Sequence, residues 1–238
     1  DSLGELMRNA RKDSTIKAVV LRINSGGGSA FASEIIRQEV LALQQSGKPL
    51  VVSMGAVAAS GAYWLAANSD EIWASPATIT GSIGIFGAIP TFEKTLASFG
   101  VYSDGVGTTP LASGLNITQP LPEQLRSAIQ QGVAHGYDQF LTIVSEGRNL
   151  DRSHVENIAG GRVFDGQTAQ NLGLVDKLGT LDDAINSAAE IASLTDFQTE
   201  YIRRPMSVRD QFFQYLTTHF PGEWITASLR LMNPTLAS

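Results

Sequence analysis

The sequence predicts an α/β fold in which helices cover a largely parallel sheet. Over the first 106 residues, apolar segments typical of buried strands alternate with amphipathic segments typical of helices. Strands that alternate with helices in this way pair in parallel through right-handed crossovers. The 238 residues are 43% hydrophobic and 17% charged, which is enough apolar material for a sizeable core and excludes disorder by composition.

The expected elements follow from the apolar pattern and its turns. Residues 1–13 have helical spacing, and residues 16–24 ("IKAVVLRIN") form a buried strand. A long helix is expected from Ser29 to the stop at Gly47 and Pro49. Residues 49–55, 71–75, 78–89 and 101–106 are expected as strands, and residues 90–100 as a short helix.

The second half of the sequence has a helical pattern. A loop rich in Gly, Thr and Pro leads to a long helix over residues 122–146, and a helix-turn-helix stretch follows. We therefore expect an α/β core over residues 1–120, which includes Ser60 as its candidate nucleophile. Residues 121–200 are expected to be a helical part of the same domain. Residues 201–238 are expected to form a helical arm that packs on its own core or contacts a partner or membrane surface.

Composition excludes several classes of function. The net charge of −6 and the scattered Lys and Arg argue against a nucleic-acid partner. The absence of cysteine excludes disulfides, a thiol nucleophile and a Cys-based metal site. No His/Asp/Glu cluster has metal-ligand spacing and no nucleotide-binding glycine pattern occurs, so neither a metal nor a cofactor is expected. No apolar run is long enough to span a bilayer, and the abrupt helical start suggests a fragment of a longer polypeptide.

The stretch "GAVAASGAYWLAA" places Ser60 among small residues between a buried strand and an apolar helix. Such a serine can simply cap the helix, or it can be a nucleophile at a helix N-terminus. The glycines in "RINSGGGSA" can free backbone N–H groups for an oxyanion hole, although nucleotide-binding loops look similar.

A serine nucleophile needs a base, and the sequence offers none near the strand ends. The histidines are His135, His154 and His219, which all fall in the expected helical part, so a Ser-His-Asp triad is not expected. The lysines are Lys12, Lys17, Lys48, Lys94 and Lys177, and none has the apolar, Gly-rich surroundings that would leave it neutral.

Four motifs in order resemble the signal peptide peptidase A family, the serine peptidases of the S49 type. They are "LRINSGGGSAFASE", "VVSMGAVAASGAYWLA", "TGSIGIFG" and "GGRVFDGQTAQNLGLVDKLG". The resemblance runs from about residue 1 to 200 and is strongest to the C-terminal half of the long, tandem-repeat form. It implies a ClpP/crotonase-like α/β fold, which agrees with the strand–helix alternation.

The resemblance also implies roles for single residues. Ser60 matches the nucleophile, and the N–H groups of Gly28 and Gly61 match the oxyanion hole. Ser82 matches a serine that hydrogen-bonds the general-base lysine. Gly26 stands where the family usually has proline, which adds an N–H donor to this loop.

The lysine itself is missing from the segment where short family members carry it. In the long form it comes from the N-terminal repeat, so the resemblance implies a Ser-Lys dyad completed from an upstream half of the same protein.

The expected function is a serine endopeptidase that hydrolyses cleaved signal peptides or other apolar peptides. The family further implies a homo-oligomer, with a tetramer as its expected size, at the periplasmic face of the bacterial inner membrane. Two alternatives stay open: a non-catalytic scaffold repeat, and a crotonase-type acyl-CoA hydratase or isomerase.

Overall fold

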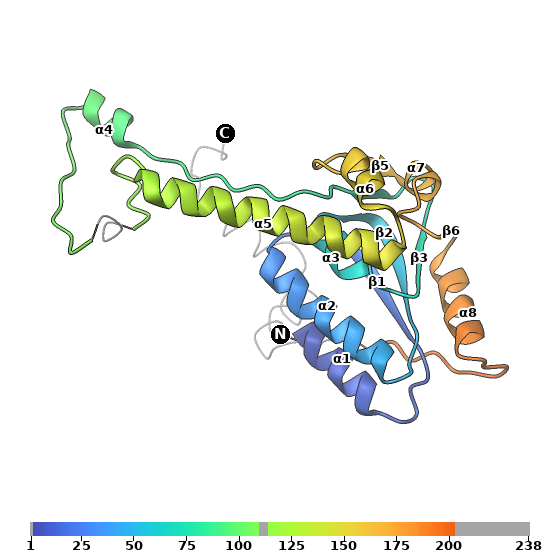
Figure 1. Ribbon diagram of the computed structural model, residues 1–238. Helices are drawn as coiled ribbons and strands as arrows, with labels where there is room; N and C mark the ends of the chain where they lie inside the picture. The colour runs from blue at the N-terminus through green and yellow to red at the C-terminus, as the bar shows by residue number, and fades with distance from the viewer. Residues whose placement is uncertain (1, 110–113, 203–238) are drawn as a thin grey trace, which may run out of the picture. The chain divides into compact units, whose positions relative to one another are not determined.

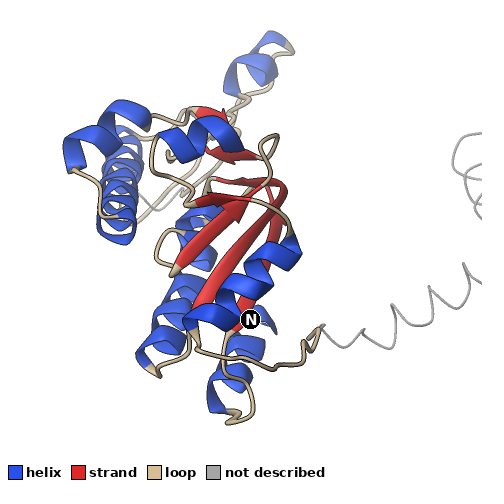
Figure 2. Ribbon diagram, turned by 90° about the vertical axis from the view of Figure 1, so that its right-hand side faces the viewer, coloured by secondary structure: helices blue, strands red, loops and turns tan. Residues whose placement is uncertain are grey.

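A six-stranded mixed sheet is the centre of the fold (Figures 1 and 2). The structure, a computed structural model, describes residues 2–109 and 114–202. Residues Leu3–Gln198 form one compact unit, which holds the sheet and the helices around it. The expected C-terminal arm over residues 201–238 lies outside the described residues, apart from its first two.

The sheet is built around one long strand. The strands are β1 (Val19–Ser25), β2 (Leu50–Ala59), β3 (Glu71–Ala74), β4 (Ile79–Gly81), β5 (Val163–Asp165) and β6 (Lys177–Leu178). Strand β2 pairs in parallel with β1, with β3 through its first half and with β4 through its last three residues. β6 is parallel to β3, and β5 is antiparallel to β4. The parallel pairing expected from the strand–helix alternation is therefore confirmed for the first four strands.

Helices follow the strands in the expected order. They are α1 (Ser2–Lys12), α2 (Ala30–Gln45), α3 (Gly61–Ala66), α4 (Glu93–Ser98), α5 (Glu123–Arg148), α6 (Arg152–Ile158), α7 (Gly166–Asn171) and α8 (Leu181–Ile191). Ser29 caps α2 by accepting the Ala32 N–H, and Thr180 caps α8 in a reciprocal pair with Asp183. No helix in the described ranges is both long and apolar enough to cross a bilayer.

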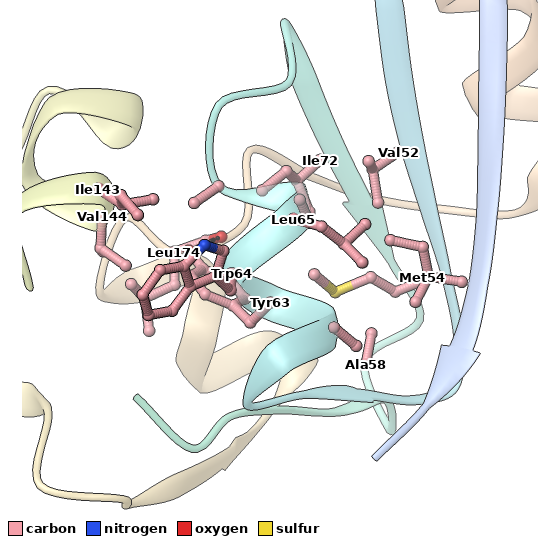
Figure 3. Packing of buried hydrophobic residues seen from close by; sticks show 14 of the residues in the cluster. Val52, Met54, Ala58, Tyr63, Trp64, Leu65, Ile72, Ile143, Val144 and Leu174 are labelled. Atoms are coloured by element: carbon pink, nitrogen blue, oxygen red, sulfur yellow. Dashed lines mark hydrogen bonds between the residues drawn. The ribbon is translucent and has the colours of Figure 1, made fainter. Parts of the chain in front are cut away.

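Side chains of β2 alternate between two apolar cores on opposite faces of the sheet. Leu50, Val52 and Met54 belong to the main core, which also holds the buried residues of α3 and α5. Val51 instead packs with alanines of α8. Figure 3 shows the aromatic side chains of α3 within the main core.

Those aromatic side chains anchor α3 firmly. Trp64 stacks at a tilt on Phe140 of α5, with 4.8 Å between ring centroids. The fully buried Tyr63 hydroxyl donates to the Leu174 carbonyl oxygen at 2.8 Å. The start of α3, where Ser60 lies, is therefore held by residues from distant parts of the sequence.

Three expectations about elements were wrong. Residues 101–106 form no strand, and the strand expected over residues 78–89 is limited to β4. The glycine-rich stretch after β4 turns away at Gly81 and Ser82, whose φ values are 83° and 51°. Residues 121–200, expected to be helical, also supply β5 and β6 to the sheet.

Candidate active site

Ser60 lies at the corner between β2 and α3 in a backbone conformation that is rare for a residue with a side chain. Its φ and ψ are 55° and −124°. Its side chain makes no capping hydrogen bond to α3, which removes the capping explanation for this serine. A strained residue at a strand-to-helix corner is typical of an exposed nucleophile.

The loop before α2 wraps closely around this corner. A methyl group added at Gly27 would lie 2.6 Å from both the Ala59 oxygen and the Gly61 nitrogen, and 2.9 Å from Ser60 Cβ. A methyl group at Gly61 would lie 3.2 Å from the Gly28 nitrogen. Only glycine lets these backbones approach so closely, so the loop and the serine corner form one site.

The predicted oxyanion donors, Gly28 and Gly61, lie side by side in this site. Gly61 is the first residue of α3, where a backbone N–H has no partner within the helix. Neither N–H donates to a backbone oxygen within the described residues. Both are therefore free to donate to an acceptor beside Ser60.

Ser82 is tied to the same corner through its neighbour. The Ser60 N–H donates to the Gly81 oxygen at 2.9 Å, and the Ser82 N–H donates to the Arg162 oxygen at 2.7 Å. The half-buried Ser82 also has a positive φ, of 51°. The structure thus brings together all four residues that the sequence singled out: Gly28, Ser60, Gly61 and Ser82.

A carboxylate on α2 holds α3 against α2. Trp64 Nε1 donates to Glu34 at 2.7 Å, and Arg37 and Gln38 donate to the same carboxylate at 2.8 Å and 2.6 Å. Burial raises the pKa of Glu34, but these hydrogen bonds outweigh it and lower the pKa from 4.5 to about 2. Glu34 is therefore ionised near neutral pH and links α2, which follows the Gly28 loop, to α3, which begins at Gly61.

The lysines lie elsewhere in the molecule. Lys17 and Lys48 donate to backbone oxygens around the end of α1, and Lys177 pairs with Glu71 at 2.8 Å. Lys12 ends α1, and Lys94 lies on α4. Within the described part of the chain, no lysine hydrogen-bonds to Ser60 or Ser82.

Neither of the two histidines in the described part of the chain hydrogen-bonds to Ser60 or Ser82. His154 contacts the Leu172 oxygen at 3.2 Å, His135 lies on α5, and His219 is outside the described residues. Residues 2–109 and 114–202 contain no group of His, Asp and Glu that could hold a metal ion.

Two further residues of the site had no role assigned from the sequence. Asn24 Oδ1 accepts the Val57 N–H at 3.1 Å where the register between β1 and β2 shifts. Ser33 lies buried against Gly61. Both belong to the motif "LRINSGGGSAFASE", but their partners are distant in sequence, so the spacing alone could not reveal them.

Comparison with known proteins identifies the family. Residues 42–195 match the model of peptidase family S49. The chain is 45% identical to Protease 4 of Salmonella typhi over 91% of its own length, and 47% identical to Protease 4 of Haemophilus influenzae over 84%. It is 33% identical to a putative signal peptide peptidase SppA of Enterococcus faecium over 80% of its length. These matches cover 35%, 34% and 55% of the respective relatives, so the chain spans about a third of either Protease 4. The chain belongs to peptidase family S49.

Proposed function

We propose that this chain supplies the nucleophile and the oxyanion hole of a serine endopeptidase. The observation that carries the proposal is Ser60, in a strained conformation at the β2–α3 corner with the Gly28 and Gly61 N–H groups beside it. The membership of this chain in a peptidase family also supports peptide hydrolysis.

The proposed reaction proceeds through an acyl-enzyme. Ser60 Oγ bonds to the peptide carbonyl carbon, its proton passes to a base, and the carbonyl electron pair moves to the oxygen beside Gly28 and Gly61. Collapse of this intermediate breaks the C–N bond, and the protonated base gives its proton to the leaving amine. Water then hydrolyses the ester in a second cycle.

We propose that the base is a neutral lysine from an upstream part of the same protein, held by Ser82. The five lysines of this chain support the proposal because none of them hydrogen-bonds to Ser60 or Ser82 among the described residues. The greater length of both Protease 4 relatives supports it too, since each has room for a second, base-carrying half.

The proposed substrates are cleaved signal peptides or other apolar peptides, at the periplasmic face of the bacterial inner membrane. The name of the Enterococcus faecium relative supports this substrate class. We propose a ClpP/crotonase-like fold and a homo-oligomer, with a tetramer as the expected size. Exposed apolar side chains between β4 and α5 support assembly, because monomers rarely expose so many together.

Labelling with an alkyl fluorophosphonate tests the proposal. The reagent is applied to the complete protein and to residues 1–238 alone, and peptide mapping locates the label. Label on Ser60 only in the complete protein is the expected result. Label on Ser60 in this chain alone places the base within these residues. If neither form is labelled and Ser60→Ala leaves peptide hydrolysis unchanged, the chain is a scaffold.

A further inference from the structure

The hydroxyl of a buried residue, Ser33, lies directly against the proposed oxyanion donors. Ser33, in the first turn of α2, is only 7% exposed. A methyl group added at Gly61 would lie 2.5 Å from Ser33 Oγ and 3.2 Å from the Gly28 nitrogen. The Ser33 hydroxyl, the Gly61 backbone and the Gly28 N–H therefore meet in one small space.

The fold does not explain this hydroxyl. The buried polar residues of the described chain are Ser33, Ser53, Ser69, Thr78, Thr80 and Ser187. Five of them use their side chains in hydrogen bonds to the rest of the protein: Ser53 accepts from Arg22, and Ser69, Thr78, Thr80 and Ser187 each donate to an oxygen. Only the Ser33 hydroxyl has no hydrogen bond to any described residue. Among these six side chains, that of Ser33 is therefore the one that the fold does not use, and its place beside Gly61 and Gly28 needs another explanation.

Helix capping is not that explanation. The cap of α2 is Ser29, whose hydroxyl accepts the Ala32 N–H at 3.3 Å. The backbone N–H of Ser33 already donates to the Ser29 oxygen at 3.0 Å. The N-terminus of α2 is thus capped by Ser29 without the Ser33 side chain.

We propose that the Ser33 hydroxyl is a third donor of the oxyanion hole, beside the N–H groups of Gly28 and Gly61. It rests on the proposed function, because its acceptor is the oxygen that becomes negative when Ser60 attacks a peptide carbonyl. A donor that meets its partner only in the transition state raises kcat without tightening substrate binding.

The test compares two buried serines in the complete protein. Ser33→Ala removes the hydroxyl at the oxyanion donors, and Ser53→Ala removes a buried hydroxyl that Arg22 hydrogen-bonds at 2.7 Å on β2. For each variant we would measure kcat and KM on an apolar fluorogenic peptide, the rate of phosphonylation of Ser60 by a fluorophosphonate, and the thermal unfolding midpoint.

We expect one substitution to lower kcat and the other to lower the unfolding midpoint. For Ser33→Ala we expect kcat to fall at least about tenfold with KM within about twofold of wild type, since loss of one oxyanion donor acts on the transition state alone. Phosphonylation should slow in parallel, because the phosphoryl oxygen occupies the same place, and the unfolding midpoint should not fall. For Ser53→Ala we expect a lower midpoint and an unchanged kcat.

Each other outcome overturns the proposal. If Ser33→Ala hydrolyses peptide as fast as an active wild type, Ser33 is not a donor, while the proposed function stands. If its midpoint falls together with kcat, or the variant does not fold, Ser33 has a structural role. If the wild type neither hydrolyses peptide nor reacts with the fluorophosphonate, the proposed function itself fails.

Discussion

Ser60 and Ser82 both hold positive φ values, of 55° and 51°. Such conformations cost about 1–3 kcal/mol each for residues with side chains and persist only where the surroundings enforce them. The enforcing contacts here are backbone hydrogen bonds, from Ser60 to Gly81 and from Ser82 to Arg162. Because Gly81 precedes Ser82 directly, the strained conformation of one serine depends on the position of the other.

Asn24 lies where β1 contacts β2, the strand that ends just before Ser60. β1 and β2 pair from Val19 to Ile23, and then the register shifts by two residues of β2 before Ser25 meets Ala58. Asn24 Oδ1 accepts the Val57 N–H within this shift. The side chain thus replaces a backbone acceptor that the bulged strand has lost.

Replacing Asn24 by Ala should remove the acceptor of the Val57 N–H. We expect a loss of about 1 kcal/mol in the free energy of unfolding, measured by urea titration, and a lower kcat because Ser60 follows closely on β2. Asn24→Asp keeps an acceptor oxygen at the same place and is the matched control. Equal losses for Ala and Asp would show that the hydrogen bond does not set the register.

At the scale of elements, the Glu34 carboxylate joins α2 to α3. Its folded-state pKa of about 2 is below the ordinary value of 4.5. For a carboxyl whose pKa is lowered by folding, the stabilisation is complete above the ordinary pKa and is lost as the pH falls through the folded value. The contribution of Glu34 is thus full above about pH 4.5 and disappears toward pH 2.

Replacing Glu34 by Gln should abolish this part of the pH dependence. We expect Glu34→Gln to be less stable than wild type by about 2 kcal/mol at pH 7, and the difference to shrink as the pH falls from 4.5 to 2. Thermal unfolding of both proteins at several pH values measures it. The exposed Glu123 provides the control, because Glu123→Gln should leave the curve unchanged. A difference that is constant with pH would contradict the assigned role.

The elements that the sequence predicted well are those whose pattern is local. The start of a long helix near Ser29 and the apolar runs of β1 and β2 can each be recognised within a few residues of sequence. β5 and β6 have three and two residues, too few for a periodic pattern, and exist because distant strands pair with them. Residues 101–106 have strand-like composition, but no strand in the described ranges lies beside them, so their apolar side chains stay exposed.

The candidate site shows the same contrast between features that lie in one motif and features that depend on distant contacts. Ser60, Gly28, Gly61 and Ser82 could be singled out because each stands in a motif, and the structure places them close together, while their catalytic roles stay a prediction. The roles inferred for Asn24 and Ser33 depend on contacts across more than twenty residues, which no spacing rule covers.

At the scale of the whole molecule, the segment between β4 and α5 differs from the rest of the unit. With the first half of α5 it extends beyond the sheet (Figure 1). Phe86, Phe99 and Tyr102 are 91%, 80% and 81% exposed in it. Large aromatic side chains are the usual anchors of protein interfaces. We therefore expect this segment to contact a second copy in the proposed oligomer.

Charges placed in this segment should weaken that assembly, because an unpaired charge is costly to bury. We expect the complete protein with Phe99→Glu and Tyr102→Glu to sediment at a lower mass than wild type at the same concentration, with an unchanged unfolding midpoint of its separated protomers. Ile191→Glu is the matched control: Ile191 is an exposed apolar residue, at 42%, but lies on α8 outside the segment. Its mass should equal that of wild type. If the double variant also keeps the wild-type mass, the copies contact each other through another surface. The exposed aromatic side chains would then bind a different partner. An apolar peptide substrate would be tested first, by photo-crosslinking from position 99.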